Sequence, residues 1–593
     1  NMKFMFSYQF GWMFWRYFFW NFVGRENGEQ GFYPWDKKDG HWLSGIKPID
    51  SWHLYNQDHL PRVIREDQSR NTYYFLPLIF GILGILFQYK RNKNDFLAIL
   101  AMWLLTGLGL CFFNNSPPNE PRERDYVLVG AIITYCIWIG MGVLFIADFL
   151  RNKLKVAPHL SQAIGAAIVL SAPVIMGFQN FDDHSRKGIT AARDYAINIL
   201  ESCKPNAIIF TYGDNDTYPV WYAQEVEGIR RDVRVINLSL IAVDWYIDSQ
   251  RRMINESPAV KMSIPSDKYR GMLRNQIYYV NPNGENAPDV EMTATQFLKW
   301  VGEDHKLSAG GGREIETYMP TTKVSIEINR QRALEMGMIT PADSNVVDRV
   351  PVAIPNSYIT KDDLAVLDII NSNINDRPIY FSVTCQEDKL LGMSDYTNME
   401  GLALRIVPIR SKSDRSFYIY GAGKMDVERT MDVLMNKFKW GNFDKEKLYV
   451  DRAYGPSVQG IRMMMMRLIT TLGTSGDSIR AAEVGQKFFS SFPNMNFQYD
   501  VKVMPFIEAL ARGAKKDEAA AALKTLVDET EDMLNFYDSL TPRQLESSYK
   551  QDKMYSISSI SQLMQLAQLI GDPELEKSIK DRLGKFQLNV TPN

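Results

Sequence analysis

The first 178 residues alternate long apolar segments with short polar ones, and the remaining residues show shorter hydrophobic periods. Four apolar segments approach or exceed the length needed to cross a hydrocarbon core of about 30 Å. They lie at residues 73–87, 96–113, 126–150 and 160–178. The last contains Pro173, which a membrane helix tolerates when neighbouring helices cover the freed carbonyl. The pattern predicts an α-helical membrane section of about four spans within residues 73–178.

The short loops between these segments predict the orientation of the section, because loops rich in lysine and arginine favour the cytoplasm. The outer two loops contain Lys90, Arg91 and Lys93, and Arg151, Lys153 and Lys155, whereas the middle loop contains only Arg122 and Arg124. We therefore expect the middle loop, residues 1–72 and all residues after 178 to face the opposite side of the membrane.

The middle loop, residues 114–126 (NNSPPNEPRERDY), is the strongest candidate for chemistry. It holds five ionisable side chains at one membrane face, namely Glu120, Arg122, Glu123, Arg124 and Asp125. Such groups are costly there unless they meet partners or a charged ligand. Guanidinium groups bind phosphate oxygens through a planar fork, so Arg122 and Arg124 are candidates to hold a lipid phosphate. Glu123 and Asp125 either neutralise the arginines by internal pairing or orient them, and both interpretations stay open.

An aromatic segment precedes the first predicted span. Residues 10–22 (FGWMFWRYFFWNF) are aromatic nearly all round, with Arg16 at the centre. A helix of this kind suits a membrane interface or a groove against other spans. Either Arg16 or Arg25 contacts a lipid phosphate, or Arg16 extends from an aromatic belt toward water. Residues 28–52 have the composition of a loop.

From about residue 188 the pattern predicts alternating helices and strands. A helix at 189–200, a strand at 207–212, a helix at 218–227 and a strand at 232–240 form a βαβ unit with a parallel strand pair. A second helix, opened at residues 360–363 by a sequence resembling a capping box, precedes a strand at 377–383. We expect a soluble α/β domain over residues 179–437.

The turn after the first strand contains Asp214 and Asp216. Ligands of open α/β sheets bind at the carboxyl ends of strands, so this pair is a candidate to bind sugar hydroxyls or, less readily, a cation. The alternative is structural: Asp216 or Thr217 caps the following helix and Asp214 stabilises its own turn. The sequence leaves the two interpretations open.

The C-terminal residues 438–593 predict an all-helical region. Helical periodicity covers residues 475–492, 501–512, 517–534 and 555–570, separated by Gly- or Pro-containing turns. Helix pairs of this length suggest a tetratricopeptide-like stack that binds another protein, or a plain helical cap on the α/β domain. The predicted organisation is thus residues 1–72 extracytoplasmic, 73–178 transmembrane, 179–437 α/β and 438–593 helical.

Composition narrows the function classes. The net charge of −2 and the absence of a basic block argue against nucleic-acid binding. Four cysteines do not form a disulfide framework, although one bridge between Cys203 and Cys385 stays open. No cofactor or metal site is expected. The chain begins with Asn and no signal peptide follows, which suggests a processed product or the back part of a longer chain.

Three motifs carry a resemblance to a known family: WRYFFWNFVGRE, PPNEPRERDYVLVGA and TYGDNDTYPVWYAQEVEGIRRDVRVINLSL. Together they resemble the GT-C-type multi-spanning membrane glycosyltransferases of Bacteroidetes, which are related to the eukaryotic transmembrane protein O-mannosyltransferase. The resemblance runs through roughly residues 8–250 and more loosely through the helical tail.

The resemblance implies transfer of a sugar, mannose, from a polyprenyl-phosphate carrier to Ser or Thr of exported proteins. It also implies a multi-pass protein of the cytoplasmic (inner) membrane with its C-terminal domain in the periplasm. Members of that family begin with a long bundle of spans and an acidic motif that supplies the proposed catalytic base, and nothing here corresponds to either. We therefore expect the C-terminal part of a transferase or a shortened relative, and assign no catalytic residue. The competing hypothesis is a membrane-anchored periplasmic scaffold without catalytic activity.

Overall fold

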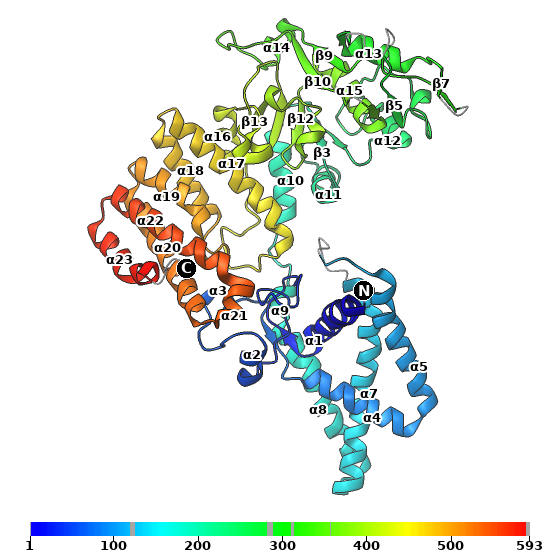
Figure 1. Cartoon of the computed structure of the whole chain (residues 1–593), viewed down its shortest axis with the longest axis vertical. Coiled ribbons are helices and arrows are strands. Elements are labelled where there is room, and N and C mark those ends of the chain that lie inside the picture. Colours follow the sequence, from blue (N-terminus) through cyan, green and yellow to red (C-terminus); the bar gives the residue numbers. More distant parts are fainter. Residues whose placement is uncertain (1, 119–124, 282–288, 310–312, 356, 589–593) are drawn as a thin grey trace.

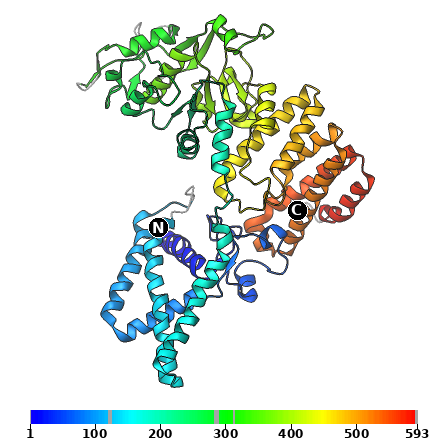
Figure 2. The same ribbon diagram turned by 180° about the vertical axis from the view of Figure 1, so that it is seen from behind.

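The protein has three regions, which Figure 1 shows in a computed structural model. Membrane helices lie at one end, a sheet-containing region lies at the other, and a stack of C-terminal helices lies beside them. The view from behind in Figure 2 shows the same arrangement, with α10 (Ala191–Ser202) rising from the membrane helices into the sheet region. The structure describes residues 2–118, 125–281, 289–309, 313–355 and 357–588.

The membrane region consists of helices that pack around an aromatic core, with a second, smaller apolar cluster between α4 and α8. They are η1 (Phe4–Arg16), α1 (Tyr17–Phe22), α4 (Leu76–Arg91), α5 (Lys93–Leu104), η2 (Leu105–Gly109), α6 (Leu110–Asn114), η3 (Asp125–Leu128), α7 (Val129–Leu154) and α8 (Pro158–Gln179). The aromatic segment η1–α1 lies in a groove against the other spans, where Phe18 contacts the rings of Trp103 and Tyr135. The expectation of an aromatic helix packed on spans is therefore confirmed.

Three helices among the described residues are long and apolar enough to cross a membrane: Lys93–Asn114, Tyr126–Leu154 and Pro158–Gln179. The prediction of four spans is not confirmed. The segment predicted first, α4, has 16 residues, and at 1.5 Å per residue its length of about 24 Å is less than the hydrocarbon thickness. It nevertheless packs closely against α7.

Glycines allow α4 and α7 to approach closely. A Cβ on Gly84 would lie 1.8 Å from the Trp138 carbonyl oxygen, and a Cβ on Gly142 would lie 2.7 Å from the Phe80 carbonyl oxygen. Small residues of this kind let membrane helices meet backbone to backbone. The Trp138 indole N–H also donates to Gln88 across this contact, at 2.6 Å.

The positions of the loops are consistent with the expectation that all soluble parts lie on the same side of the membrane. The turns that contain Lys90–Lys93 and Arg151–Lys155 lie at the end of the helices farthest from the sheet region and the C-terminal helices (Figure 1). Residues 24–72 lie at the opposite end, next to the soluble regions (Figure 1). Which end faces the cytoplasm stays a prediction from charge.

The soluble region is built on a six-stranded mixed sheet in the order β15-β13-β14-β12-β3-β4. Its strands are β3 (Ile208–Thr211), β4 (Arg234–Asn237), β12 (Ile379–Ser382), β13 (Thr397–Glu400), β14 (Ala403–Ile406) and β15 (Lys424–Met425). Strands β12, β3 and β4 are parallel, and β14 runs antiparallel to β12. The predicted βαβ unit is confirmed, with α11 (Asp214–Glu225) between β3 and β4.

The second predicted helix, α15 (Lys361–Asn373), does precede β12. Its start is not a complete capping box, because the Thr360 side chain donates to Asp363 at 3.1 Å and accepts no backbone N–H. Smaller elements complete the region: α12 (Asp244–Gln250), β5 (Gln276–Tyr278), β6 (Met292–Thr293), α13 (Ala294–Gly302), β7 (Leu307–Ala309), β8 (Arg313–Ile315), β9 (Lys323–Glu327), α14 (Arg330–Glu335), β10 (Arg349–Ala353) and β11 (Tyr358–Thr360). Cys203 and Cys385 are buried free thiols, so they form no bridge.

The C-terminal region is helical, as expected. It contains α16 (Val427–Asn436), α17 (Gly455–Thr474), α18 (Ser478–Ser491), α19 (Met504–Arg512), α20 (Lys516–Ser539), α22 (Lys550–Ile570) and α23 (Pro573–Leu588). Consecutive helices from α17 onward pack on one another, and Phe488 of α18 stacks on Phe506 of α19 with ring centres 3.7 Å apart. The turn at Gly571 ends α22 in the left-handed region, and Asp572 caps α23 by accepting from the N–H groups of Glu574 and Leu575.

Candidate functional site

The candidate site lies where residues 24–72 cover the aromatic helix at the membrane face. Strand β1 (Gly24–Arg25) pairs with β2 (Asn71–Thr72) and bridges to Trp42, which folds the loop back on the end of α1. The short helices α2 (Lys47–His53) and α3 (Arg62–Arg65) complete it. A loop with so little regular structure depends on its side chains for hydrogen bonds, and it buries many polar groups.

Arg16 fixes this loop to the aromatic helix. Its side chain is 5% exposed, with the guanidinium 4.9 Å from the centre of the Trp12 ring. Its Nη1 donates to the Gly40 carbonyl at 3.4 Å, and its Nε donates to the Trp12 carbonyl at 3.3 Å. The side chain therefore points into the protein rather than along an aromatic belt toward water.

Arg25 occupies the opposite side of the loop. Its guanidinium lies 4.1 Å from the centre of the Trp20 ring, and Nη1 lies 3.7 Å from the buried Asp183 carboxylate of α9 (Phe181–His184). The Nε of Arg25 is buried and has no hydrogen-bond partner among the described residues. Arg25 thus ties the loop to the segment that leads into the soluble region, and retains one unused donor.

A cluster of ionisable side chains lies within this loop: Glu26, His41 and Tyr55, which are buried, and His53, which is half-buried, here named the juxtamembrane cluster. Glu26 and His41 are each 1% exposed, and Tyr55 is fully buried. The Tyr55 hydroxyl donates to Glu26 Oε1, and the rings of His41 and His53 lie 5.5 Å apart. His41 Nε2 donates to the Asp36 carbonyl at 2.6 Å, which assigns the neutral tautomer with a free Nδ1.

Burial shifts the acid–base behaviour of this cluster. Desolvation raises the pKa of Glu26 from 4.5 to about 8, and the Tyr55 hydrogen bond and the Arg70 charge only partly oppose it. Desolvation lowers the pKa of His41 and of His53 from 6.5 to about 3 each, and the nearby Lys37 adds to both shifts. At neutral pH the cluster therefore holds a protonated carboxyl group and two neutral imidazoles.

Three polar atoms of the cluster have no hydrogen-bond partner in the described part of the chain: Glu26 Oε2, His41 Nδ1 and His53 Nε2. Unsatisfied buried polar atoms are rare in folded proteins and concentrate at functional sites. A protonated carboxyl group can donate a proton, and a neutral imidazole can accept one. The described residues contain no group of three His, Cys, Asp or Glu side chains suited to a metal ion.

The C-terminal helices close this site from the other side. Tyr55 packs against the rings of Phe536 and Tyr549, and the Lys37 N–H donates to the Ser548 hydroxyl at 2.8 Å. Arg62 forms an ion pair with the buried Glu529 of α20. Residues 24–72 and the C-terminal helices therefore form one site, although they lie far apart in the sequence.

The charged loop starts beside this site. Gln9 Nε2 donates to the Ser116 carbonyl at 2.7 Å, and the Tyr8 hydroxyl lies within hydrogen-bond distance of the carbonyls of Phe32 and Pro118. Arg122, Glu123 and Arg124 lie outside the described residues; Asp125 begins η3, and only its backbone position is described. The start of the candidate loop is thus held next to the loop that covers Arg16.

Asp214 and Asp216 lie in a different place, at the carboxyl end of β3. Asp214 is exposed, whereas Asp216 is 4% exposed and accepts hydrogen bonds from Thr384 Oγ1 at 2.5 Å and the Tyr212 N–H at 3.3 Å. The expectation that Asp216 or Thr217 caps the helix is wrong, because α11 begins at Asp214 after Gly213. Asp216 instead connects the ends of β3 and β12.

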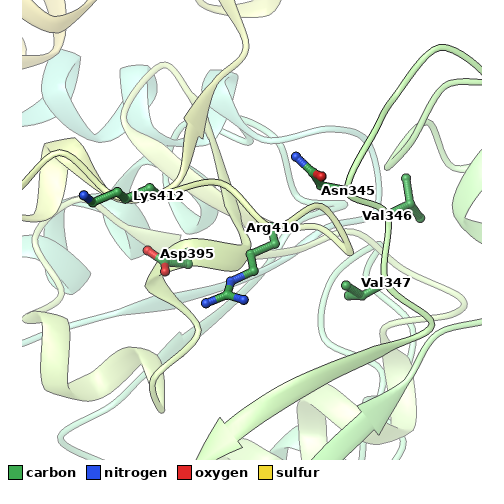
Figure 3. Close-up of a pocket in the computed structure, with 6 residues that line it drawn as sticks. All are labelled: Asn345, Val346, Val347, Asp395, Arg410 and Lys412. Atoms are coloured by element: carbon green, nitrogen blue, oxygen red, sulfur yellow. The ribbon is translucent and has the colours of Figure 1, made fainter.

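A separate cavity of about 650 Å³ opens in the sheet region (Figure 3). Its lining residues are Asn345, Val346, Val347, Asp395, Arg410 and Lys412. Arg410 and Lys412 are exposed, and Asp395 accepts hydrogen bonds from Ser413. None of the residues singled out from the sequence lines it.

The sequence analysis missed Glu26, His41, His53 and Tyr55. One signal was present: Glu26 directly follows Arg25 inside the motif WRYFFWNFVGRE, and two of the six histidines of the chain lie within the next 27 residues. The aperiodic loop composition gave no indication of this burial, because it depends on distant residues. Tyr55 is covered by rings of the C-terminal helices, whereas the His41 ring packs on Trp12 of η1.

Comparisons with known proteins relate the soluble region to one family. Residues 192–429 match the family model described as TMEM260-associated domain 2. A curated relative, the protein O-mannosyl-transferase TMEM260 of Mus musculus, is 23% identical over 195 residues, which cover 31% of this chain and 26% of that protein. No solved structure gives a significant match. The chain is a membrane protein related to the TMEM260 family, and its alignment spans about a quarter of the mouse protein.

Proposed function

We propose that the chain is the C-terminal part of a GT-C-type membrane glycosyltransferase of the Bacteroidetes type. The enzyme moves mannose from a polyprenyl-phosphate carrier to Ser or Thr of exported proteins at the outer face of the inner membrane. The observation that carries the proposal is the match of residues 192–429 to the TMEM260-associated domain, joined to membrane helices in one chain. The mouse relative is named a protein O-mannosyl-transferase.

In this proposal the polyprenyl-phosphate carrier binds at the membrane face, beside the loop of residues 114–126. When the sugar leaves its phosphate, negative charge develops on the phosphate oxygens, and preorganised guanidinium groups stabilise it. Arg122 and Arg124 are the proposed phosphate ligands, with Glu123 and Asp125 orienting them. Support comes from the start of their loop, which Tyr8 and Gln9 hold next to the loop that covers Arg16.

Arg25 is a further proposed phosphate ligand, because its buried Nε has no partner within the described residues and lies at the same loop. Glu26 is a weak candidate for the base that accepts the acceptor hydroxyl's proton. With a pKa of about 8 it is mostly protonated at neutral pH, and it is 1% exposed. We assign it a positioning role and leave the catalytic base to the part of the protein outside this chain.

The second candidate function is a periplasmic scaffold without catalysis. Its support is the stack of C-terminal helices, since tetratricopeptide-like stacks bind protein partners. The upstream coding sequence distinguishes the two proposals. An in-frame segment with many more spans and an acidic first loop favours the transferase, and its absence favours the scaffold.

The direct test uses membranes that contain the complete gene product. Labelled mannose is supplied as its polyprenyl phosphate, together with a Ser/Thr-rich peptide, and transfer is measured for wild type and for Arg122→Lys and Arg124→Lys. Lysine keeps the charge and loses the fork, so we expect at least a tenfold loss. The matched control is Arg65→Lys, an exposed residue of residues 24–72 that pairs only with Glu66 among the described residues. Wild-type rates in both loop variants contradict the phosphate role.

A further inference from the structure

The sheet has a topological switch point between β3 and β12. The chain passes from β3 through α11 to β4 on one side, and later adds β12 on the other side of β3. All three strands are parallel, so the loops that follow β3 and β12 leave the same edge in opposite directions. Open α/β sheets bind their ligands in the crevice at such a point. Asp216 and Thr384 lie there, one after each strand.

The turn after β3 is rigid. Gly213 has φ 78° and ψ 178°, a conformation available essentially to glycine alone. The Thr217 hydroxyl donates to the Gly213 carbonyl at 2.8 Å, and Asn237 Nδ2 donates to Thr217 at 3.0 Å. Strain held in place by buried hydrogen bonds is typical of a functional turn. The turn orients Asp216 toward the end of β12.

Asp216 has an unused acceptor. Its Oδ2 is occupied by Thr384 and the Tyr212 N–H, whereas its Oδ1 is buried and has no partner among the described residues. The Ser382 hydroxyl lies close enough to help lower the pKa of this carboxyl group but makes no hydrogen bond with Oδ1. An unsatisfied buried carboxylate oxygen costs stability, so its retention requires a compensating role. No lysine or arginine lies among the groups that influence this carboxylate. The site is therefore unsuited to a phosphate.

Hydroxyl groups surround the carboxylate. Thr384 Oγ1 also lies 2.9 Å from the Ser382 hydroxyl. Tyr195 of α10 and Tyr420, next to α17, both lie close enough for the Asp216 charge to raise their pKa values, after the larger effect of burial. Both tyrosine hydroxyls lie over Gly460, at 3.8 and 2.6 Å from the position of an added Cβ.

We propose that this switch point binds a neutral, hydroxyl-rich ligand, a hexose unit, through Asp216, Thr384, Tyr195 and Tyr420. A sugar hydroxyl donates to the free Asp216 Oδ1, and the tyrosine and threonine hydroxyls accept from or donate to its neighbours. A carboxylate acceptor strengthens such a bond. The choice of mannose as the hexose rests on the proposed function, whereas the hydroxyl-rich chemistry rests on these residues alone.

The test measures binding without turnover. The full chain in lipid nanodiscs is titrated with methyl α-mannopyranoside, with an O-mannosylated Ser/Thr peptide and with the same peptide unmodified, and saturation-transfer NMR reports contact. We expect binding of the free mannoside or of the mannosyl peptide, and none of the bare peptide. Tighter binding of the mannosyl peptide identifies the sugar on an acceptor as the ligand; equal binding identifies the free sugar unit.

Two variants and one control make the assignment specific. Asp216→Asn keeps the shape and the Thr384 contact but removes the charge, and Thr384→Val removes the neighbouring hydroxyl; we expect at least tenfold weaker binding in each. Glu225→Gln, at the exposed far end of the same helix, should bind as wild type. No mannoside binding by wild type, or wild-type binding by Asp216→Asn, overturns the proposal. If mannoside binding depends on Asp216 while loss of the gene leaves glycoprotein labelling unchanged, the proposed function fails and this site stands.

Discussion

The Tyr55 hydroxyl donates a hydrogen bond to Glu26, and both side chains are buried where the C-terminal helices meet the membrane-side loop. A carboxyl group in this position favours its protonated form, which keeps the neutral pair inside the protein without an uncompensated charge. The junction between membrane and soluble regions is therefore sensitive to the protonation of one residue.

The stability of the junction should depend on pH through Glu26. Its pKa is about 8 in the folded protein against 4.5 ordinarily, so between these values the folded state holds a proton that the unfolded state has lost. Stability therefore falls as pH rises from about 4.5 to about 8. Glu26→Gln removes this titration. Between pH 6.5 and 8.5 the unfolding temperature of the detergent-solubilised protein should fall for wild type and stay level for the variant. Equal declines would show that Glu26 has its ordinary pKa.

The two histidines should produce the opposite slope at lower pH. Their folded pKa values of about 3 lie below the ordinary 6.5, so the unfolded state takes up protons first as pH falls. Stability is lost below about pH 6.5. His41→Gln should make the decline between pH 6.5 and 5 shallower, whereas replacing the exposed His59 by Gln should not change it. A variant profile identical to that of wild type would contradict burial of a neutral His41.

The contact between the loop and the C-terminal helices should depend on Glu529. Its carboxylate is 7% exposed and accepts hydrogen bonds from Asn494 and Gln498 besides its ion pair with Arg62. Glu529→Ala should cost about 1–3 kcal/mol, because it leaves buried donors unpaired. Hydrogen exchange should rise in residues 54–66 and stay unchanged in β3 and β12.

The control for that change is Glu508→Ala, which removes an exposed pair with Arg512 on one helix and should cost less than about 0.5 kcal/mol. If both variants leave exchange in residues 54–66 unchanged, the C-terminal helices do not hold the loop.

The packing of α4 on α7 should fail when Gly84 gains a side chain. An added Cβ meets the Trp138 carbonyl oxygen at 1.8 Å, so the helices must separate. Gly84→Ala should destabilise the membrane region by about 1–3 kcal/mol. Gly140→Ala on α7 is the matched control, since nothing lies within 4 Å of its added Cβ. Unfolding temperatures of the purified variants measure the difference, and equal values would exclude the close approach.

The unpaired Asp216 carboxylate should lower the stability of the fold while it favours ligand binding. Burial raises its pKa, and one of its oxygens lacks a partner within the described residues. Asp216→Asn removes a buried charge and retains an oxygen to accept from Thr384, so the unfolding temperature should stay equal or rise. A clear fall in unfolding temperature would show that the carboxylate stabilises the fold and would remove the argument that it is kept for a ligand.

The sequence predicts well those parts in which neighbouring residues decide the structure. The apolar periods locate the long membrane helices, and the pattern around residues 207–240 predicts the parallel pair of β3 and β4. The prediction of four spans exceeded what the structure supports, because the apolar segment of α4 forms only a 16-residue helix.

The site is less predictable because it depends on contacts between distant residues. Tyr55 packs against Phe536 and Tyr549, about 500 residues further along the chain, and no local pattern contains that information. The sequence left open whether Asp216 or Thr217 caps the helix; Gly213 is the N-cap instead, because the conformation of Gly213, which starts α11 two residues before Asp216, follows from the tertiary turn. Arg122, Glu123 and Arg124 stay predictions, since they lie outside the described residues.

Labelling of exported proteins tests the central claim most directly. Cells with and without the gene are fed radiolabelled mannose, and the label on Ser and Thr of exported proteins is measured after alkaline release. We expect the label to fall strongly in the deletion strain and to return with the intact gene, but not with the gene carrying both Arg122→Lys and Arg124→Lys. Unchanged labelling in the deletion strain would contradict the role in protein O-mannosylation.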